Sequence, residues 1–287
     1  MSPINPPWKM PVIGVFDSGF GGLTVLRELR RVLPAADYLY FGDTAHLPYG
    51  AKSVHTVARY AVAAAHFLEQ HKIEMLVVAC NTATALAFNE IRSAVSVPVV
   101  GVVEPGAQRA AAISKSRKAV VIATDATVSS HAYQKALHSL GLEATEKACP
   151  LFVPLVEEGW VEHPVTEQVA HLYLDELFHN GARDADVLVL GCTHYPLLRP
   201  LLRRVVPHRV EIVDSAESTA ARVLDLLKKD LLKQNLPEKE RLKKNPDPAL
   251  AGGLRCYATD SVEKFKRLGS KFLGCPLENV ELVDIEK

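Results

Sequence analysis

Two short stretches of similar sequence decide the fold class of this chain: LVVACNT at residues 76–82 and LVLGCTH at residues 188–194. Each begins as an uninterrupted apolar run and ends in a cysteine followed by polar residues. A continuous apolar run of this length is typical of a strand covered on both faces, as in a parallel sheet. We therefore expect Cys80 and Cys192 each to stand at the carboxyl end of a buried strand.

Runs of the same kind recur along the chain and alternate with longer amphipathic segments. The runs predict strands at Val12–Phe16, Tyr38–Phe41, Met75–Ala79, Val99–Val103, Ala119–Ala123, Val187–Leu190, Val210–Val213 and Leu254–Ala258. The amphipathic segments predict helices that include Leu23–Leu33, Val54–His71 and Val262–Leu273. Strands that alternate with helices in this way are typical of an α/β protein with parallel sheets.

The second half of the chain repeats the pattern of the first. The first half reads IGVFDSG (13–19), LVVACNT and VVGVVEP (99–105), and the second reads VVIATDAT (120–127), LVLGCTH and VEIVDSA (210–216). The two halves of any doubly wound protein show some similarity of this kind, but the two matching cysteines favour a real repeat of architecture. We expect two similar parallel-sheet α/β domains, residues 1–104 with 216–287 and residues 105–215. Pseudo-twofold symmetry would relate them, with the active site in the cleft between them.

Composition excludes several classes of protein. The chain has 287 residues, of which 48% are hydrophobic and 23% charged, the balance of a globular protein. Lys and Arg total 33, as do Asp and Glu, so no basic excess favours direct binding of nucleic acid. No run has the composition of a membrane span, and the opening residues MSPINPPWKM do not resemble a signal peptide. The charged, proline-containing stretch Lys228–Gly253 predicts a solvated helix end and loop.

The five cysteines contain no CxxC pair, which favours free thiols in a reducing cytoplasm. A lone cysteine at a strand end is usually a small buried hydrophobe, as we expect for Cys149, Cys256 and Cys275. Cys80 and Cys192 differ because polar, helix-capping residues follow both of them. A helix N-terminus there would lower the thiol pKa toward neutrality.

A third polar strand end is FDSGFGGL at residues 16–23. Its glycines fit neither the GxGxxG dinucleotide spacing nor a P-loop, so a nucleotide site is disfavoured. We expect Asp17 and Ser18 to face a small polar ligand instead, because ligands bind at the carboxyl ends of strands in open α/β sheets.

Two thiols in one site allow several chemistries. Cys80, Cys192 and His194 could bind zinc, but zinc sites usually have three or four ligands at closer spacing in the sequence. A redox pair lacks the CxxC motif, and a papain-like nucleophile would leave one cysteine without a role. Two acid/base groups on opposite faces of a carbon could instead remove a proton on one side and return it on the other. The apparent repeat favours this last chemistry, that of a racemase or epimerase.

The chain resembles the glutamate racemases, within the cofactor-independent aspartate/glutamate racemase superfamily. The resemblance runs from about Ile13 to about Gly274. The motifs that carry it are FDSGFGGLTV (16–25), YFGDTAHLPYG (40–50), VVACNTATA (77–85), VVGVVEPGA (99–107), CPLFVPLVEEG (149–159) and LVLGCTHYPLL (188–198). ACNTAT together with GCTHYP is highly specific, whereas either alone would be only suggestive.

The resemblance implies interconversion of L- and D-glutamate with no cofactor and no metal. Cys80 would act on the D-enantiomer and Cys192 on the L-enantiomer, with Asp17 and His194 beside the respective thiols. The positions that match the family's substrate-binding residues are Asp17, Ser18, Tyr49, Gly50, Asn81, Thr82, Thr124, Thr127, Glu157, Thr193 and His194.

The resemblance also implies a biological setting. The product D-glutamate would feed peptidoglycan synthesis in a bacterial cytoplasm, away from membranes. A homodimer is expected, because family members are often dimers, and regulation by a cell-wall precursor occurs in some of them. The alternatives are an aspartate or hydantoin racemase, a related decarboxylase, and a binding protein that keeps the fold without turnover.

Overall fold

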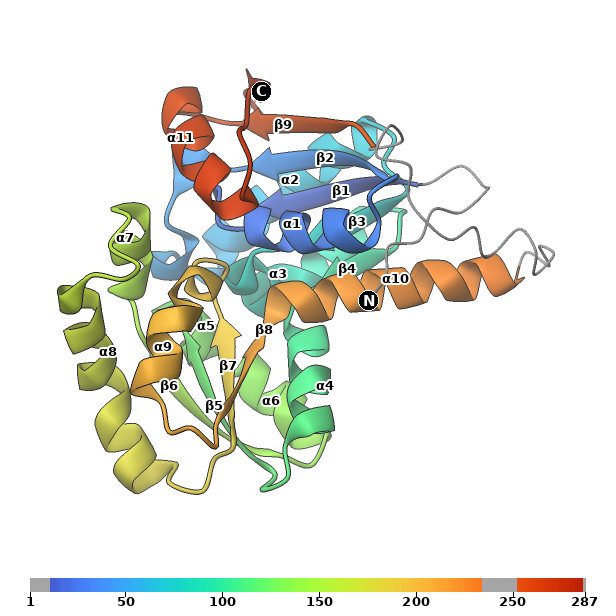
Figure 1. The fold of residues 1–287 in the computed structure, drawn as a ribbon. Coiled ribbons are helices and arrows are strands. Elements are labelled where there is room, and N and C mark those ends of the chain that lie inside the picture. Colours follow the sequence, from blue (N-terminus) through green and yellow to red (C-terminus); the bar gives the residue numbers. More distant parts are fainter. Residues whose placement is uncertain (1–10, 234–251, 286–287) are drawn as a thin grey trace.

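The computed structural model describes residues 11–233 and 252–285, and these residues form two parallel β-sheets flanked by helices (Figure 1). The expected α/β class is confirmed. The lead-in at residues 1–10 and most of the charged stretch at 228–253 lie outside the described residues.

The strands are β1 (Val12–Asp17), β2 (Asp37–Gly42), β3 (Met75–Val78), β4 (Val99–Gly101), β5 (Lys118–Ala123), β6 (Glu143–Ala148), β7 (Val187–Gly191), β8 (Glu211–Asp214), β9 (Leu254–Ala258) and β10 (Val280–Leu282). The α-helices are α1 (Leu23–Val32), α2 (Val54–Gln70), α3 (Asn81–Ala94), α4 (Val103–Ile113), α5 (Asp125–Ser130), α6 (Ala132–Ser139), α7 (Phe152–Glu157), α8 (Pro164–Glu176), α9 (Arg199–Val205), α10 (Ser215–Lys233) and α11 (Val262–Leu273). Shorter helical turns are η1 (Thr44–His46), η2 (Tyr49–Ala51), η3 (Leu177–Gly181) and η4 (Tyr195–Leu198).

The two sheets share one strand order. The six-stranded sheet has the order β10-β9-β2-β1-β3-β4, and the four-stranded sheet has the order β6-β5-β7-β8. The last four strands of the six-stranded order, β2-β1-β3-β4, therefore correspond strand by strand to β6-β5-β7-β8. Cys80 follows β3 and Cys192 follows β7, so the two thiols stand at equivalent strand ends.

Alternating side chains of the central strands divide the core into layers. Alternate residues of the first sheet pack with α1 and α11 on one face and with α2 and α3 on the other. The second sheet packs in the same way between α7–α9 and the pair α4 and α6. One hydrophobic cluster runs through both sheets and includes Val15, Leu26, Ile122 and Leu198. The two sheets are therefore joined by packed apolar side chains, and α10 crosses between them (Figure 1).

The sequence misplaced one strand end and missed two strands. The run Val99–Val103 predicts a single strand, but β4 ends at Gly101 and Val103 already begins α4. β6 reads EATEKA and escaped prediction because an edge strand with partly exposed side chains needs no apolar run. β10 is three residues long and, among the described strands, pairs with β9 alone. β9 lies in the last segment of the chain and pairs in parallel with β2 of the six-stranded sheet. In the part of the chain that the structure describes, no helix is both long and apolar enough to span a bilayer.

Candidate functional site

Both thiols are buried between helix starts and strand ends. Cys80 is 5% exposed and caps α3, where its Sγ accepts the Ala83 N–H at 3.4 Å and donates to Ser18 Oγ at 3.5 Å. Cys192 is 6% exposed, directly after β7. Burial is the main cause that raises the pKa of Cys192, and a negative charge on Cys80 raises it further. The two predicted acid/base groups therefore lie near one another although the chain separates them widely.

Unpartnered polar atoms surround the thiols. Among the described residues, the buried side-chain nitrogen and oxygen atoms without a hydrogen-bond partner are Asp17 Oδ1, Asn81 Nδ2 and His194 Nε2. A buried polar atom without a partner costs about 1–3 kcal/mol, so proteins rarely leave one that a ligand does not use. Asn81 follows Cys80 in the chain and His194 lies two residues after Cys192. Asp17 Oδ1 and Asn81 Nδ2 are therefore the atoms at which a polar ligand would complete the hydrogen bonding, whereas His194 Nε2 lies 3.4 Å from Glu157 Oε1.

The loop after β1 reaches across to the second sheet. Asp17 is buried, and its Oδ2 accepts the Gly19 N–H at 2.9 Å. The Thr24 hydroxyl donates to the Thr193 carbonyl oxygen at 3.1 Å. Gly21 lies so close to this turn that a Cβ there would stand 2.6 Å from His194 Nδ1. A glycine is therefore required for the two strand ends to approach this closely.

A second set of contacts joins the α3 N-terminus to α5. Thr82 Oγ1 lies 3.0 Å from Thr124 Oγ1 and 3.2 Å from Thr127 Oγ1, and the latter two are 3.0 Å apart. Thr124 also caps α5 by accepting the Thr127 N–H at 3.4 Å. The Tyr133 hydroxyl donates to Asn81 Oδ1 at 2.7 Å, which leaves the amide nitrogen of Asn81 as its free donor. These contacts fix the residues next to Cys80 against the second sheet.

His194 is held from two sides. Its Nε2 lies 3.4 Å from Glu157 Oε1, an ion-pair distance that is not aligned as a hydrogen bond. Glu157 Oε2 lies 3.3 Å from Lys264 Nζ on α11. The His194 ring also packs against the rings of Phe20 and Phe272. Although burial alone would raise the pKa of Glu157, His194 and Lys264 outweigh it and lower that pKa.

Tyr49 and Gly50 lie in η2, beside the same site. The Tyr49 side chain is buried in the core, and its hydroxyl donates to Asp43 Oδ2 at 2.6 Å. Gly50 lies against Thr124, because a Cβ added at Gly50 would stand only 2.9 Å from the Thr124 Cβ. The structure thus brings this turn to the α5 N-terminus, while the Tyr49 hydroxyl is already occupied by Asp43.

The expected low pKa of the thiols is wrong for this structure. Burial, and secondarily the charge of Asp17, raises the pKa of Cys80 to about 12. Burial also raises the pKa of Cys192, against the opposing effect of the His194 backbone N–H. Burial likewise raises the pKa of Asp17. Desolvation outweighs the helix N-terminus here, so both thiols are protonated at neutral pH.

Sequence reasoning missed several residues that build the site. Thr24, Tyr133 and Lys264 contact predicted site residues from elements distant in sequence. No local motif marks them, although Thr24 lies inside a motif quoted above. The described part of the chain holds no group of three or more His, Cys, Asp and Glu side chains arranged for a metal ion.

A family model described as Asp/Glu/Hydantoin racemase matches residues 12–223. A curated glutamate racemase from Koribacter versatilis (strain Ellin345) is 58% identical over 286 residues, covering 96% of this chain and 98% of its own length. A crystal structure of glutamate racemase from Francisella tularensis with D-glutamate has a TM-score of 0.84 at 33% identity, covering 97% of this chain and 98% of that chain. The Escherichia coli glutamate racemase, solved with L-glutamate and the activator UDP-MurNAc-ala, has a TM-score of 0.69 at 26% identity, covering 96% and 98%.

Proposed function

The chain belongs to the Asp/Glu/hydantoin racemase family and interconverts L-glutamate and D-glutamate, and from this premise we propose that Cys80 and Cys192 exchange the α-proton. One thiolate takes the proton from Cα, and the other thiol delivers its own proton to the opposite face. The C–H bond broken on one side is replaced by a C–H bond on the other. After one turnover the thiol and the thiolate have exchanged places, and no proton is gained or lost. Cys80 acts on D-glutamate and Cys192 on L-glutamate.

The observation that carries this proposal is the pair of thiols at equivalent strand ends, with unpartnered polar atoms beside both. A racemase must remove the α-proton from either of two mirror-image substrates. Two thiols at equivalent strand ends of two similar sheets suit that task. A single nucleophilic cysteine would need only one of these positions. The geometry therefore favours proton exchange over a one-cysteine mechanism.

Stabilising the deprotonated substrate is the main chemical problem, because an α-proton is weakly acidic. Neutral donors that face the site can hold the substrate carboxylate as charge builds on it. Ser18, Asn81, Thr82 and Thr193 supply such donors, and Asn81 Nδ2 is free to serve. The burial of both thiols excludes water, which strengthens these interactions. We propose that the reaction needs no cofactor and no metal.

The substrate itself lowers the pKa of the thiols in this proposal. Ionised Asp17 is one cause of the raised pKa of Cys80. An α-ammonium group bound at Asp17 Oδ1 would neutralise that charge and favour the thiolate. We propose that His194, which lies 3.4 Å from Glu157, accepts and returns the proton of Cys192. Thr124, Thr127, Tyr49 and Gly50 complete the wall around the substrate.

Solvent deuterium tests the proposal directly. Protein free of pyridoxal phosphate is incubated with each enantiomer in D2O, and optical activity and α-deuterium are followed together. Cys80→Ser and Cys192→Ser should each lose racemisation by roughly a thousandfold, the usual effect of removing an acid/base group. Cys80→Ser should still exchange the α-proton of L-glutamate, and Cys192→Ser that of D-glutamate, each without inversion. Cys275→Ser, at an exposed cysteine, is the control and should behave as the parent protein.

The opposite pattern of exchange would reverse the assignment of the two thiols. Racemisation that survives in either variant would exclude the two-thiol mechanism. A parent protein that neither racemises nor exchanges glutamate or aspartate would instead be a binding protein on this scaffold.

The setting of the enzyme extends the proposal. D-glutamate is a peptidoglycan precursor, so we place the reaction in cell-wall synthesis in the cytoplasm. The relative from Escherichia coli is described with the activator UDP-MurNAc-ala, and we propose that a similar cell-wall precursor regulates this enzyme. A homodimer and the domain division at residues 104/105 and 215/216 are further parts of the proposal. Sedimentation with and without the precursor tests the homodimer. The racemisation rate under the same two conditions tests regulation by the precursor.

A further inference from the structure

A hollow of about 770 Å³ lies on the second sheet's side of the molecule, between the end of α8, the turn η3 and the segment after α9. The residues that line it are Leu174, Asp175, Phe178, His179, Asn180, Arg183, Asp184, Val205, Pro207 and Arg209. None of them belongs to the set proposed for glutamate chemistry. Its volume falls within the range of about 300–1,000 Å³ that is typical of small-molecule sites.

The floor of the hollow is apolar. Leu174 and Phe178 are buried, and Val205 and Pro207 are partly buried beside them. The π-helical turn η3 continues α8 at this point, a departure from regular helix that is frequent at functional sites. A ligand that enters the hollow would therefore bury an apolar body against these side chains.

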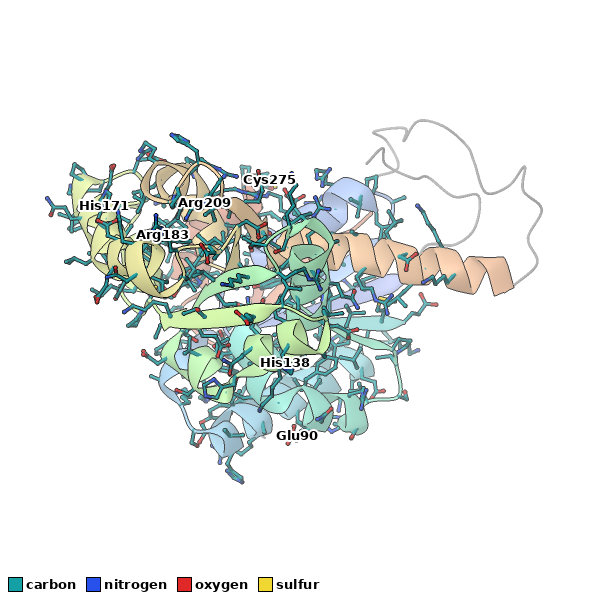
Figure 2. All side chains as sticks on the ribbon, turned by 90° about the horizontal axis from the view of Figure 1, so that it is seen from below. Glu90, His138, His171, Arg183, Arg209 and Cys275 are labelled. Carbon is teal, nitrogen blue, oxygen red and sulfur yellow. The ribbon has the colours of Figure 1, made fainter. Side chains whose placement is uncertain are left out.

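The rim of the hollow carries two arginines, Arg183 and Arg209, and two carboxylates, Asp175 and Asp184. Asp184 is paired with Lys118 at 3.2 Å, and Asp175 Oδ1 lies 2.9 Å from His171 Nδ1. Arg183 and Arg209 have no carboxylate partner within the described ranges, and Figure 2 shows both near the His171 end of the molecule. The guanidinium of Arg209 donates to the backbone carbonyl oxygen of Arg183. This hydrogen bond holds the Arg209 side chain against the turn that carries Arg183.

We propose that this hollow binds a small organic anion with an apolar body: a carboxylate, sulfonate or phosphate that carries an aromatic or branched aliphatic group. The two guanidinium groups hold the anionic end through charge-assisted hydrogen bonds. The floor formed by Leu174, Phe178, Val205 and Pro207 holds the apolar end. The site is separate from the two thiols, so its occupation does not compete with glutamate.

Fluorescence titration with 8-anilinonaphthalene-1-sulfonate tests the proposal, because this probe combines a sulfonate with an aromatic body. Saturable binding is expected, and glutamate should not displace the probe. The uncharged analogue N-phenyl-1-naphthylamine should bind more weakly. Arg183→Gln should weaken probe binding by about 3- to 10-fold, the effect of losing one partly exposed charged hydrogen bond. Arg209→Lys keeps the positive charge and should bind nearly as the parent protein does.

Two further variants keep the test decisive. Val205→Trp keeps both arginines but covers part of the apolar floor with an indole ring, so it should weaken probe binding without changing the racemisation rate. Arg92→Gln removes an exposed arginine of α3 and should change nothing. Displacement of the probe by glutamate, or equal binding by Arg183→Gln, Val205→Trp and the parent protein, would overturn the proposal. Melting temperatures of all variants show that each one is folded.

Discussion

Replacing Gly21 by alanine tests the close approach of the two strand ends. The new Cβ would stand 2.6 Å from His194 Nδ1, 2.7 Å from His194 Cε1 and closer still to Thr193 Oγ1. Carbon atoms pack best at about 3.5–4.0 Å, so the turn at 192–194 must move by roughly 1 Å. Overpacking of a filled interior costs about 1–3 kcal/mol, and a shift of about 1 Å near reacting atoms can cost about 100-fold in rate.

The assay follows both quantities in the same preparation. Circular dichroism of glutamate gives the racemisation rate from each enantiomer, and a thermal melt gives the loss of stability. The two enantiomers have equal free energy in water, so kcat/KM must fall by the same factor in both directions. Gly181→Ala is the matched control, since nothing lies within 4 Å of a Cβ at that position. A Gly21→Ala variant with parental kcat/KM and melting temperature would refute the reasoning, because the strand ends could not then be packed as described.

Three other predictions concern charge and access. Asp17→Asn should raise the melting temperature at pH 7 while lowering activity: burial raises the pKa of Asp17, so its ionised form opposes folding above the unfolded pKa of about 4. The gain should vanish as the pH falls to about 4, and melts from pH 4 to 8 that show no gain at any pH would contradict it. Lys264→Met removes a cation that lowers the pKa of Glu157, so the acidic limb of the pH–rate profile should move to higher pH, whereas Lys264→Arg should leave it in place; identical limbs in both variants would exclude this role. Amide hydrogen exchange should slow around residues 18–24 and 192–195 when glutamate is added, because the buried thiols must be uncovered for substrate to enter; equal protection with and without glutamate would count against that motion.

The sequence predicted those parts of the fold that depend on short continuous patterns. Short apolar runs such as those of β3 and β7 favour strands buried on both faces, and the cysteine after each run indicated where to propose the site. β6 could not be found, because its stability comes from pairing with β5 and its own residues EATEKA carry no apolar pattern. The end of β4 was misplaced since Val102 and Val103 are apolar in a helix start as well as in a strand.

The contacts around the thiols were predictable only in part. The residues within the cysteine motifs were identified because they adjoin Cys80 or Cys192 in the chain. Tyr133 and Lys264 reach the site from α6 and α11, and only the packing of whole helices brings them there. The thiol pKa was misjudged for the same reason: the helix start is visible in the sequence, whereas the depth of burial is not.

The burial of Cys80 and Cys192 also bears on how the protein withstands oxidants. Peroxides and alkylating agents attack thiolates, and a protonated thiol reacts far more slowly. Desolvation raises the pKa of both cysteines and so favours their protonated, less reactive form. Cys275, the exposed cysteine of the described residues, is the one that such reagents meet first. In the proposed mechanism, oxidants would therefore meet a thiolate at Cys80 or Cys192 only during the interval in which bound substrate has deprotonated one of them.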